Sequence, residues 1–141
     1  MDELHLGELH LGELHLGEFG LDEQLLDPFD LQHCMLCPRF CGVDRLSDER
    51  GFCNEGSEIQ AARAALHFYE EPCISGTKGS GAVFFSGCNL RCVFCQNREI
   101  STGRAQKPLR AGQLSDIFLR LQEEGAHNIN LVTAIHFVVS A

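Results

Sequence analysis

The chain has 141 residues, of which 44% are apolar and 22% are charged, so its composition is that of a folded domain with a buried core. No apolar run approaches the roughly 20 residues of a membrane-spanning helix, which argues against a membrane partner. The formal charge is −9, and residues 1–30 account for all of it, because they hold nine acids and no Lys or Arg. An acidic chain without a basic excess also argues against nucleic acid as a partner.

Residues 1–30 form a low-complexity acidic leader, in which residues 4–18 are three copies of Leu-His-Leu-Gly-Glu. With a period of five residues, the leucines would not share one face of a helix or of a strand. We therefore expect this leader to be largely disordered. A secretory signal would begin with positive charge, which is missing here. We therefore expect a cytoplasmic protein with reduced thiols.

The chain contains eight cysteines, and with reduced thiols their close spacing indicates metal binding rather than disulfides. They are Cys34, Cys37, Cys41, Cys53, Cys73, Cys88, Cys92 and Cys95.

Residues 31–81 are predicted to form a cysteine-rich module built mainly from loops. Cys34, Cys37, Cys41 and Cys53 have the spacing C-x2-C-x3-C-x11-C, which suits a structural zinc ion or an auxiliary iron–sulfur cluster, although unbound thiols stay open. Arg39 and Arg45 could balance the charge of the thiolates.

The rest of this module carries weaker signals. Cys73 has no spaced partner and is expected to be a small buried residue. Residues 57–68 could be either a helix or an extended segment against a sheet. Gly76–Gly81 precedes a strand instead of following one, so it indicates a turn and not a phosphate loop.

Residues 82–141 predict the clearest architecture, which is of the α/β class. Residues 82–86 and 129–133 are short apolar runs typical of buried strands. Between them, apolar residues at i, i+3, i+4 and i+7 predict an amphipathic helix that Gly125 ends. Strand, helix and strand at this spacing indicate a βαβ unit with two parallel strands. The helical positions are Leu114, Ile117, Phe118 and Leu121.

A long loop over residues 87–111 separates the first strand from the helix, and its length favours a functional role. Cys88, Cys92 and Cys95 lie in it with the spacing C-x3-C-x2-C. Tetrahedral zinc requires four ligands, whereas three thiolates could hold three irons of a [4Fe–4S] cluster and leave one iron open. Arg91 could offset the negative charge of such a cluster, and a structural zinc loop or plain thiols remain alternatives.

With Phe94 as its aromatic residue, this pattern resembles the C-x3-C-x-aromatic-C signature of the radical S-adenosylmethionine (radical SAM) superfamily. The chain is similar in more detail to the proteins related to pyruvate formate-lyase activating enzyme, over about residues 33–141. The matching residues are Cys34–Gly42, Arg45, Gly51–Cys53, Glu70–Gly76, Gly79–Gly81, Phe84–Cys88, Phe94–Asn97 and Ile100–Ser101.

The resemblance implies that a partial (β/α) barrel follows the cysteine-rich module. Cys88, Cys92 and Cys95 would bind three irons of a [4Fe–4S] cluster, and the fourth iron would bind S-adenosylmethionine. Electron transfer from the reduced cluster would cleave this cofactor to a 5′-deoxyadenosyl radical, which abstracts hydrogen from a substrate.

The resemblance also implies partners. It implies an electron donor such as flavodoxin or ferredoxin, and a substrate that could be a protein, as for the activators of glycyl-radical enzymes. Thr133 and His136 are weak candidates for contact with the cofactor. Because residues 82–141 contain only the beginning of a barrel, we expect an incomplete radical SAM domain. A non-catalytic zinc or iron–sulfur module and an inactive fragment are the alternative interpretations.

Overall fold

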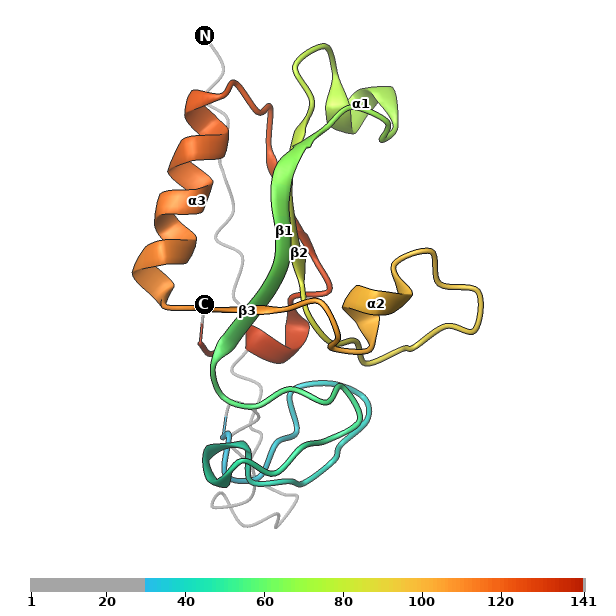
Figure 1. The fold of residues 1–141 in the computed structure, drawn as a ribbon, viewed down its shortest axis with the longest axis vertical. Coiled ribbons are helices and arrows are strands. Elements are labelled where there is room, and N and C mark those ends of the chain that lie inside the picture. Colours follow the sequence, from blue (N-terminus) through green and yellow to red (C-terminus); the bar gives the residue numbers. More distant parts are fainter. Residues whose placement is uncertain (1–29, 141) are drawn as a thin grey trace, which may run out of the picture.

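A computed structural model describes residues 30–140 of the chain (Figure 1). The predicted leader therefore lies outside the described residues, except for Asp30. Among the residues that are described, no helix is long and apolar enough to cross a membrane.

Within residues 30–140, four strands form one mixed sheet in the order β3-β1-β2-β4. Strand β1 pairs antiparallel with both β2 and β3, whereas β2 and β4 are parallel. The fold is thus α/β, and the predicted parallel pair is confirmed. The bounds are Ile59–His67 for β1, Ser80–Phe85 for β2, Lys107–Leu109 for β3 and Ile129–Val132 for β4.

The ambiguous segment 57–68 contains strand β1, which lies between β2 and β3. Alanine favours a helix locally, but pairing on both edges gives the β1 backbone its hydrogen-bond partners. Because β1 pairs with β2, the sheet joins residues on both sides of the predicted module boundary at 81/82, and that boundary falls inside β2.

Helix α3 (Ala111–Glu123) covers one side of the sheet (Figure 1). Leu114 and Leu121 are buried in the core with Val83 and Phe85 of β2, as the helical spacing predicts. The backbone N–H of Arg110 donates to Gln113 Oε1 at 2.9 Å and caps the first turn. Gly125 follows the helix with a φ of +94°, which confirms the predicted terminal glycine.

The long loop predicted over residues 87–111 contains two short elements that the sequence did not indicate. Helix α2 (Arg98–Ser101) and strand β3 interrupt it. Strand β3 has three residues, one of them Pro108, and lies at the edge of the sheet, where a proline is tolerated. So short a strand carries no readable alternation, which explains why it was missed.

The remaining short elements lie between or beside the strands of the sheet. Helix α1 (Pro72–Ser75) joins β1 to β2, and two 3-10 turns, η1 (Arg45–Ser47) and η2 (Ile135–Phe137), lie before β1 and after β4. Residues 30–58 form irregular loops beyond one end of the sheet (Figure 1).

Candidate functional site

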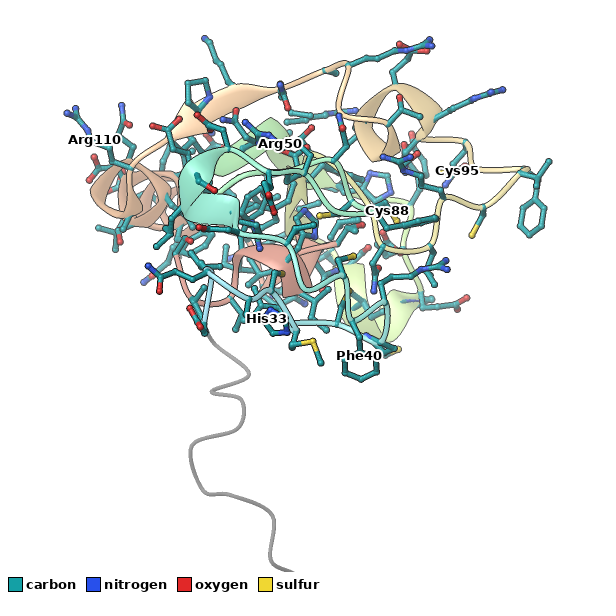
Figure 2. The ribbon with its side chains drawn as sticks, turned by 90° about the horizontal axis from the view of Figure 1, so that it is seen from below. His33, Phe40, Arg50, Cys88, Cys95 and Arg110 are labelled. Carbon is teal, nitrogen blue, oxygen red and sulfur yellow. The ribbon has the colours of Figure 1, made fainter. Side chains whose placement is uncertain are left out.

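The cysteine loop, residues 87–97, leaves the carboxyl end of β2 and projects from the body of the molecule (Figure 1). Gly87 begins it with a φ of +73°, and the Gly87 N–H donates to the Ile100 carbonyl at 2.9 Å. This bond closes the base of the loop, because Ile100 lies in α2 beyond its far end. Figure 2 shows Cys88 near the body and Cys95 farther out.

The three thiols of this loop are free, and backbone hydrogen bonds form around them. The Leu90 N–H donates to Cys88 Sγ at 3.3 Å, and the Cys95 N–H donates to the Cys92 carbonyl at 3.2 Å. An N–H that points at sulfur stabilises a thiolate and tunes an iron–sulfur cluster bound to it. Cys88 and Cys95 are half-buried, whereas Cys92 is exposed.

The structure places Cys92 and Cys95 in one turn, but it does not gather all three sulfurs around one point. In the described part of the chain, no three Cys, His, Asp or Glu side chains converge as ligands of one metal ion. The donor set suits a thiolate-bound cluster, and its convergence is not seen in this structure.

The second group of cysteines lies in the cysteine knuckle, residues 34–53. The Cys34 N–H donates to the Val43 carbonyl, and the Gly42 N–H donates back to the Cys34 carbonyl, both at 3.0 Å. A turn closes from Cys37 to Phe40 at 3.0 Å. These bonds fold residues 34–43 back on themselves.

The thiols of the knuckle have different surroundings. The Phe52 N–H donates to Cys41 Sγ at 3.3 Å, so this sulfur also accepts a backbone donor. Cys34 and Cys53 are buried, and burial raises the pKa of the Cys53 thiol, although the nearby Arg45 guanidinium opposes that rise.

Arg45 lies at the centre of this region and is only 1% exposed. Its guanidinium donates to the carbonyl oxygens of Gly56, at 3.0 Å from Nε, and of His136, at 2.6 Å. It also approaches Cys34 Sγ at 3.9 Å. As the sequence suggested for this residue, the cation is close to the knuckle thiols, and it also connects the knuckle to turn η2.

Arg39 and Phe52 join the knuckle to the cysteine loop. Arg39 Nε donates to the Asn89 carbonyl at 2.7 Å, and its guanidinium carbon lies 3.8 Å from the centre of the Phe52 ring. Arg91 approaches the same ring at 5.1 Å. The two groups of cysteines, far apart in sequence, therefore lie on neighbouring segments.

Two buried polar residues, Glu55 and His136, lie under the cysteine loop, and the sequence did not indicate Glu55. Glu55 is 1% exposed, its Oε1 has no hydrogen-bond partner, and burial raises the pKa of its carboxyl group. It lies directly beneath Gly87, where an added Cβ would be 2.4 Å from Glu55 Cγ. A single glutamate in a loop carries no pattern that would have revealed this burial.

His136 is the second buried group, although the sequence singled it out only weakly. It is 2% exposed, and burial lowers its pKa, which favours the neutral ring. Its Nε2 is 2.7 Å from the Ser86 carbonyl, so Nε2 carries the proton and donates there, at the end of β2. His136 thus supports the strand end from which the cysteine loop departs.

The other predicted positions are more peripheral. Cys73 was expected to be buried, which is wrong: it is exposed, because α1 is a single short turn that presents it to solvent. Gly76 and Gly79 have positive φ, which supports the predicted turn. Thr133 is half-buried, with a φ of +62°.

Comparison with known proteins gives little guidance on function. No protein-family model matches the chain, and no solved structure matches it. An uncharacterized protein of Methanocaldococcus jannaschii is 41% identical over 70 residues, which are 50% of this chain and 19% of that protein. The chain therefore matches only about a fifth of the length of this relative.

Proposed function

We propose that the chain carries the cluster-binding part of a radical SAM iron–sulfur protein, with Cys88, Cys92 and Cys95 as the ligands of a [4Fe–4S] cluster. The observation that carries this proposal is the position of three free thiols, spaced C-x3-C-x2-C, on the loop that follows the carboxyl end of β2. In barrels of parallel strands, active sites are built on such loops. The β2–β4 pair would then be the first part of the partial barrel.

The surroundings of the loop are consistent with this assignment. Cys88 Sγ accepts the Leu90 N–H, Arg39 bonds to the loop from the knuckle, and Arg91 lies within the loop, so both positive charges oppose that of thiolates. When bound, the cluster would supply the electron that cleaves S-adenosylmethionine. The protein would hold the thiolates, oppose their charge and position the loop through Gly87 and His136.

The test is reconstitution of the full chain with iron and sulfide without oxygen. We expect about four irons per chain at this loop, and Cys92→Ala should lose these irons and the visible absorbance that belongs to them. Cys73→Ala is the matched control, since Cys73 is also an exposed free thiol but lies on α1, and it should keep the cluster. A Cys92→Ala variant with a full cluster would contradict the ligand assignment.

Cleavage of S-adenosylmethionine is tested separately from cluster binding, because the chain matches only 19% of the relative's length. The reduced, reconstituted chain is mixed with S-adenosylmethionine and a low-potential electron donor such as flavodoxin. Formation of methionine and 5′-deoxyadenosine supports the enzymatic proposal. A loaded cluster without these products contradicts it for this chain and leaves cluster binding standing.

A second candidate function is metal binding by the knuckle for structure alone. Cys34 and Cys53 are both buried close to Arg45, and Cys41 Sγ accepts a backbone N–H. Four thiolates suit zinc or an auxiliary cluster. Zinc, iron and sulfide counts in Cys92→Ala, which leaves the knuckle intact, distinguish these cases: one zinc without iron supports the structural interpretation.

A further inference from the structure

A small pocket opens between the cysteine loop and helix α2. Of the predicted metal ligands, only Cys92 lines it. Its volume is about 290 Å³. A pocket of this size accommodates one small group rather than a whole large ligand. We call it the arginine pocket, and its lining residues are Arg91, Cys92, Val93, Arg98, Ser101 and Thr102.

The two arginines give the pocket an unbalanced positive charge. Neither Arg91 nor Arg98 has a carboxylate within 4.0 Å among the described residues, although Arg104 in the same region pairs with Glu99 at 3.4 Å. The only acid between residues 87 and 104 is therefore already engaged. Both arginines therefore keep N–H donors for another acceptor, and the Arg91 guanidinium carbon lies 5.1 Å from the centre of the Phe52 ring.

The local backbone conformation sets the positions of these two arginines. Arg91 has a φ of +49°, a left-handed conformation that is unfavourable for a residue with a side chain. Arg98 begins α2, and its carbonyl accepts Ser101 Oγ at 3.2 Å and Thr102 Oγ1 at 2.8 Å. The hydroxyl protons are thus used within the turn, which leaves the arginines as the side-chain donors of the pocket lining.

We propose that the arginine pocket binds an oxyanion, namely a phosphate or carboxylate group of a ligand, next to Cys92. A guanidinium presents paired N–H donors that match the oxygens of such a group, and two of them around one small pocket favour an anion over a neutral ligand. The site holds the anion beside the exposed thiol at the tip of the loop.

Alkylation of Cys92 in the full, metal-free chain tests this proposal. Iodoacetate carries a negative charge and iodoacetamide is neutral, while both react with the same thiolate. The ratio of their rates therefore removes the effect of the arginines on the thiolate fraction and reports only attraction of the anionic reagent. Peptide mass spectrometry assigns each rate to Cys92 and to Cys73, the exposed reference thiol.

We expect the iodoacetate-to-iodoacetamide ratio at Cys92 to fall by about threefold or more in Arg91→Gly and in Arg98→Gln, with no change at Cys73. Glycine is chosen at position 91 because it adopts the positive φ without strain. Arg110→Gln is the matched control: Arg110 is exposed and does not line the pocket, and Figure 2 shows it on the opposite side from Cys95. It should leave the ratio unchanged.

Competition separates a binding site from a general positive potential. Inorganic phosphate, or acetate in a second arm, should slow the reaction of Cys92 with iodoacetate more than sodium chloride of the same ionic strength, and should not affect Cys73. The more effective arm identifies the ligand group as phosphate or carboxylate. An unchanged ratio in both pocket variants, or inhibition no greater than that by chloride, would overturn the proposal. Because no metal is present in this test, neither result bears on cluster binding.

Discussion

The buried cation at Arg45 allows a quantitative prediction about stability. Arg45→Met keeps an apolar stem of similar length but removes the donors to the carbonyl oxygens of Gly56 and His136, both in buried residues. Each unsatisfied buried acceptor costs about 1–3 kcal/mol, which gives roughly 2–6 kcal/mol for the two. Removing the desolvated charge offsets part of this loss, so we expect a net destabilisation of about 3 kcal/mol.

Thermal unfolding of the metal-free chain under reducing conditions measures this effect. For a domain of about 100 residues, the expected loss lowers Tm by roughly 10–20 °C. Arg45→Lys should fall between the wild type and Arg45→Met, because one ammonium group cannot bond both carbonyls in the same way. Arg63→Met is the control at an exposed position of β1 and should change stability by no more than about 0.5 kcal/mol.

Refutation would come from an Arg45→Met variant that unfolds at the temperature of the wild type. The bridge between the knuckle and turn η2 would then contribute nothing to the fold. Full recovery of Tm in Arg45→Lys would show instead that charge alone matters, and that the bonds to the two carbonyls do not.

Two further predictions concern the base of the cysteine loop. Gly87→Ala should destabilise the fold strongly, because the new Cβ would lie 2.4 Å from Glu55 Cγ. In Gly112→Ala the new Cβ meets nothing within 4 Å, so this variant should raise stability by up to about 1 kcal/mol in helix α3. Chemical denaturation compares the two variants, and equal effects on the free energy of unfolding would contradict the structure. Burial lowers the pKa of His136, so the unfolded state binds the proton more readily, and stability should fall as pH drops below the unfolded value of about 6.5. His136→Gln, which keeps a donor for the Ser86 carbonyl, should show a shallower loss over this range, and identical pH profiles would refute the assignment.

The regular elements near the cysteine loop were predictable because their signals are local. A short apolar run and the i, i+3, i+4, i+7 spacing depend on residues within one element, and both β2 and α3 form where these patterns predict them. Strand β3 was missed because its pairing with β1 decides its conformation, and three residues carry no periodicity of their own.

The polar residues under the loop were less predictable. The cysteine spacings mark candidate ligands directly, but Arg45 and Glu55 look like ordinary charged residues of an exposed loop. Their burial depends on segments distant in the sequence: Arg45 bonds His136, 91 residues away, and Glu55 lies beneath Gly87. The burial of Cys73 was predicted from residue type alone, and the single turn of α1 decided otherwise.

The sequence by itself determined the class of the fold, the βαβ unit and the two sets of thiols with their spacings, since each follows from residues close together along the chain. Only the tertiary structure decided that β1 lies between β2 and β3, that the knuckle meets the cysteine loop through Arg39, and that two arginines share one pocket with Cys92. The physical reason is that these contacts join segments far apart in sequence, so they arise only when burial of the sheet brings the segments together.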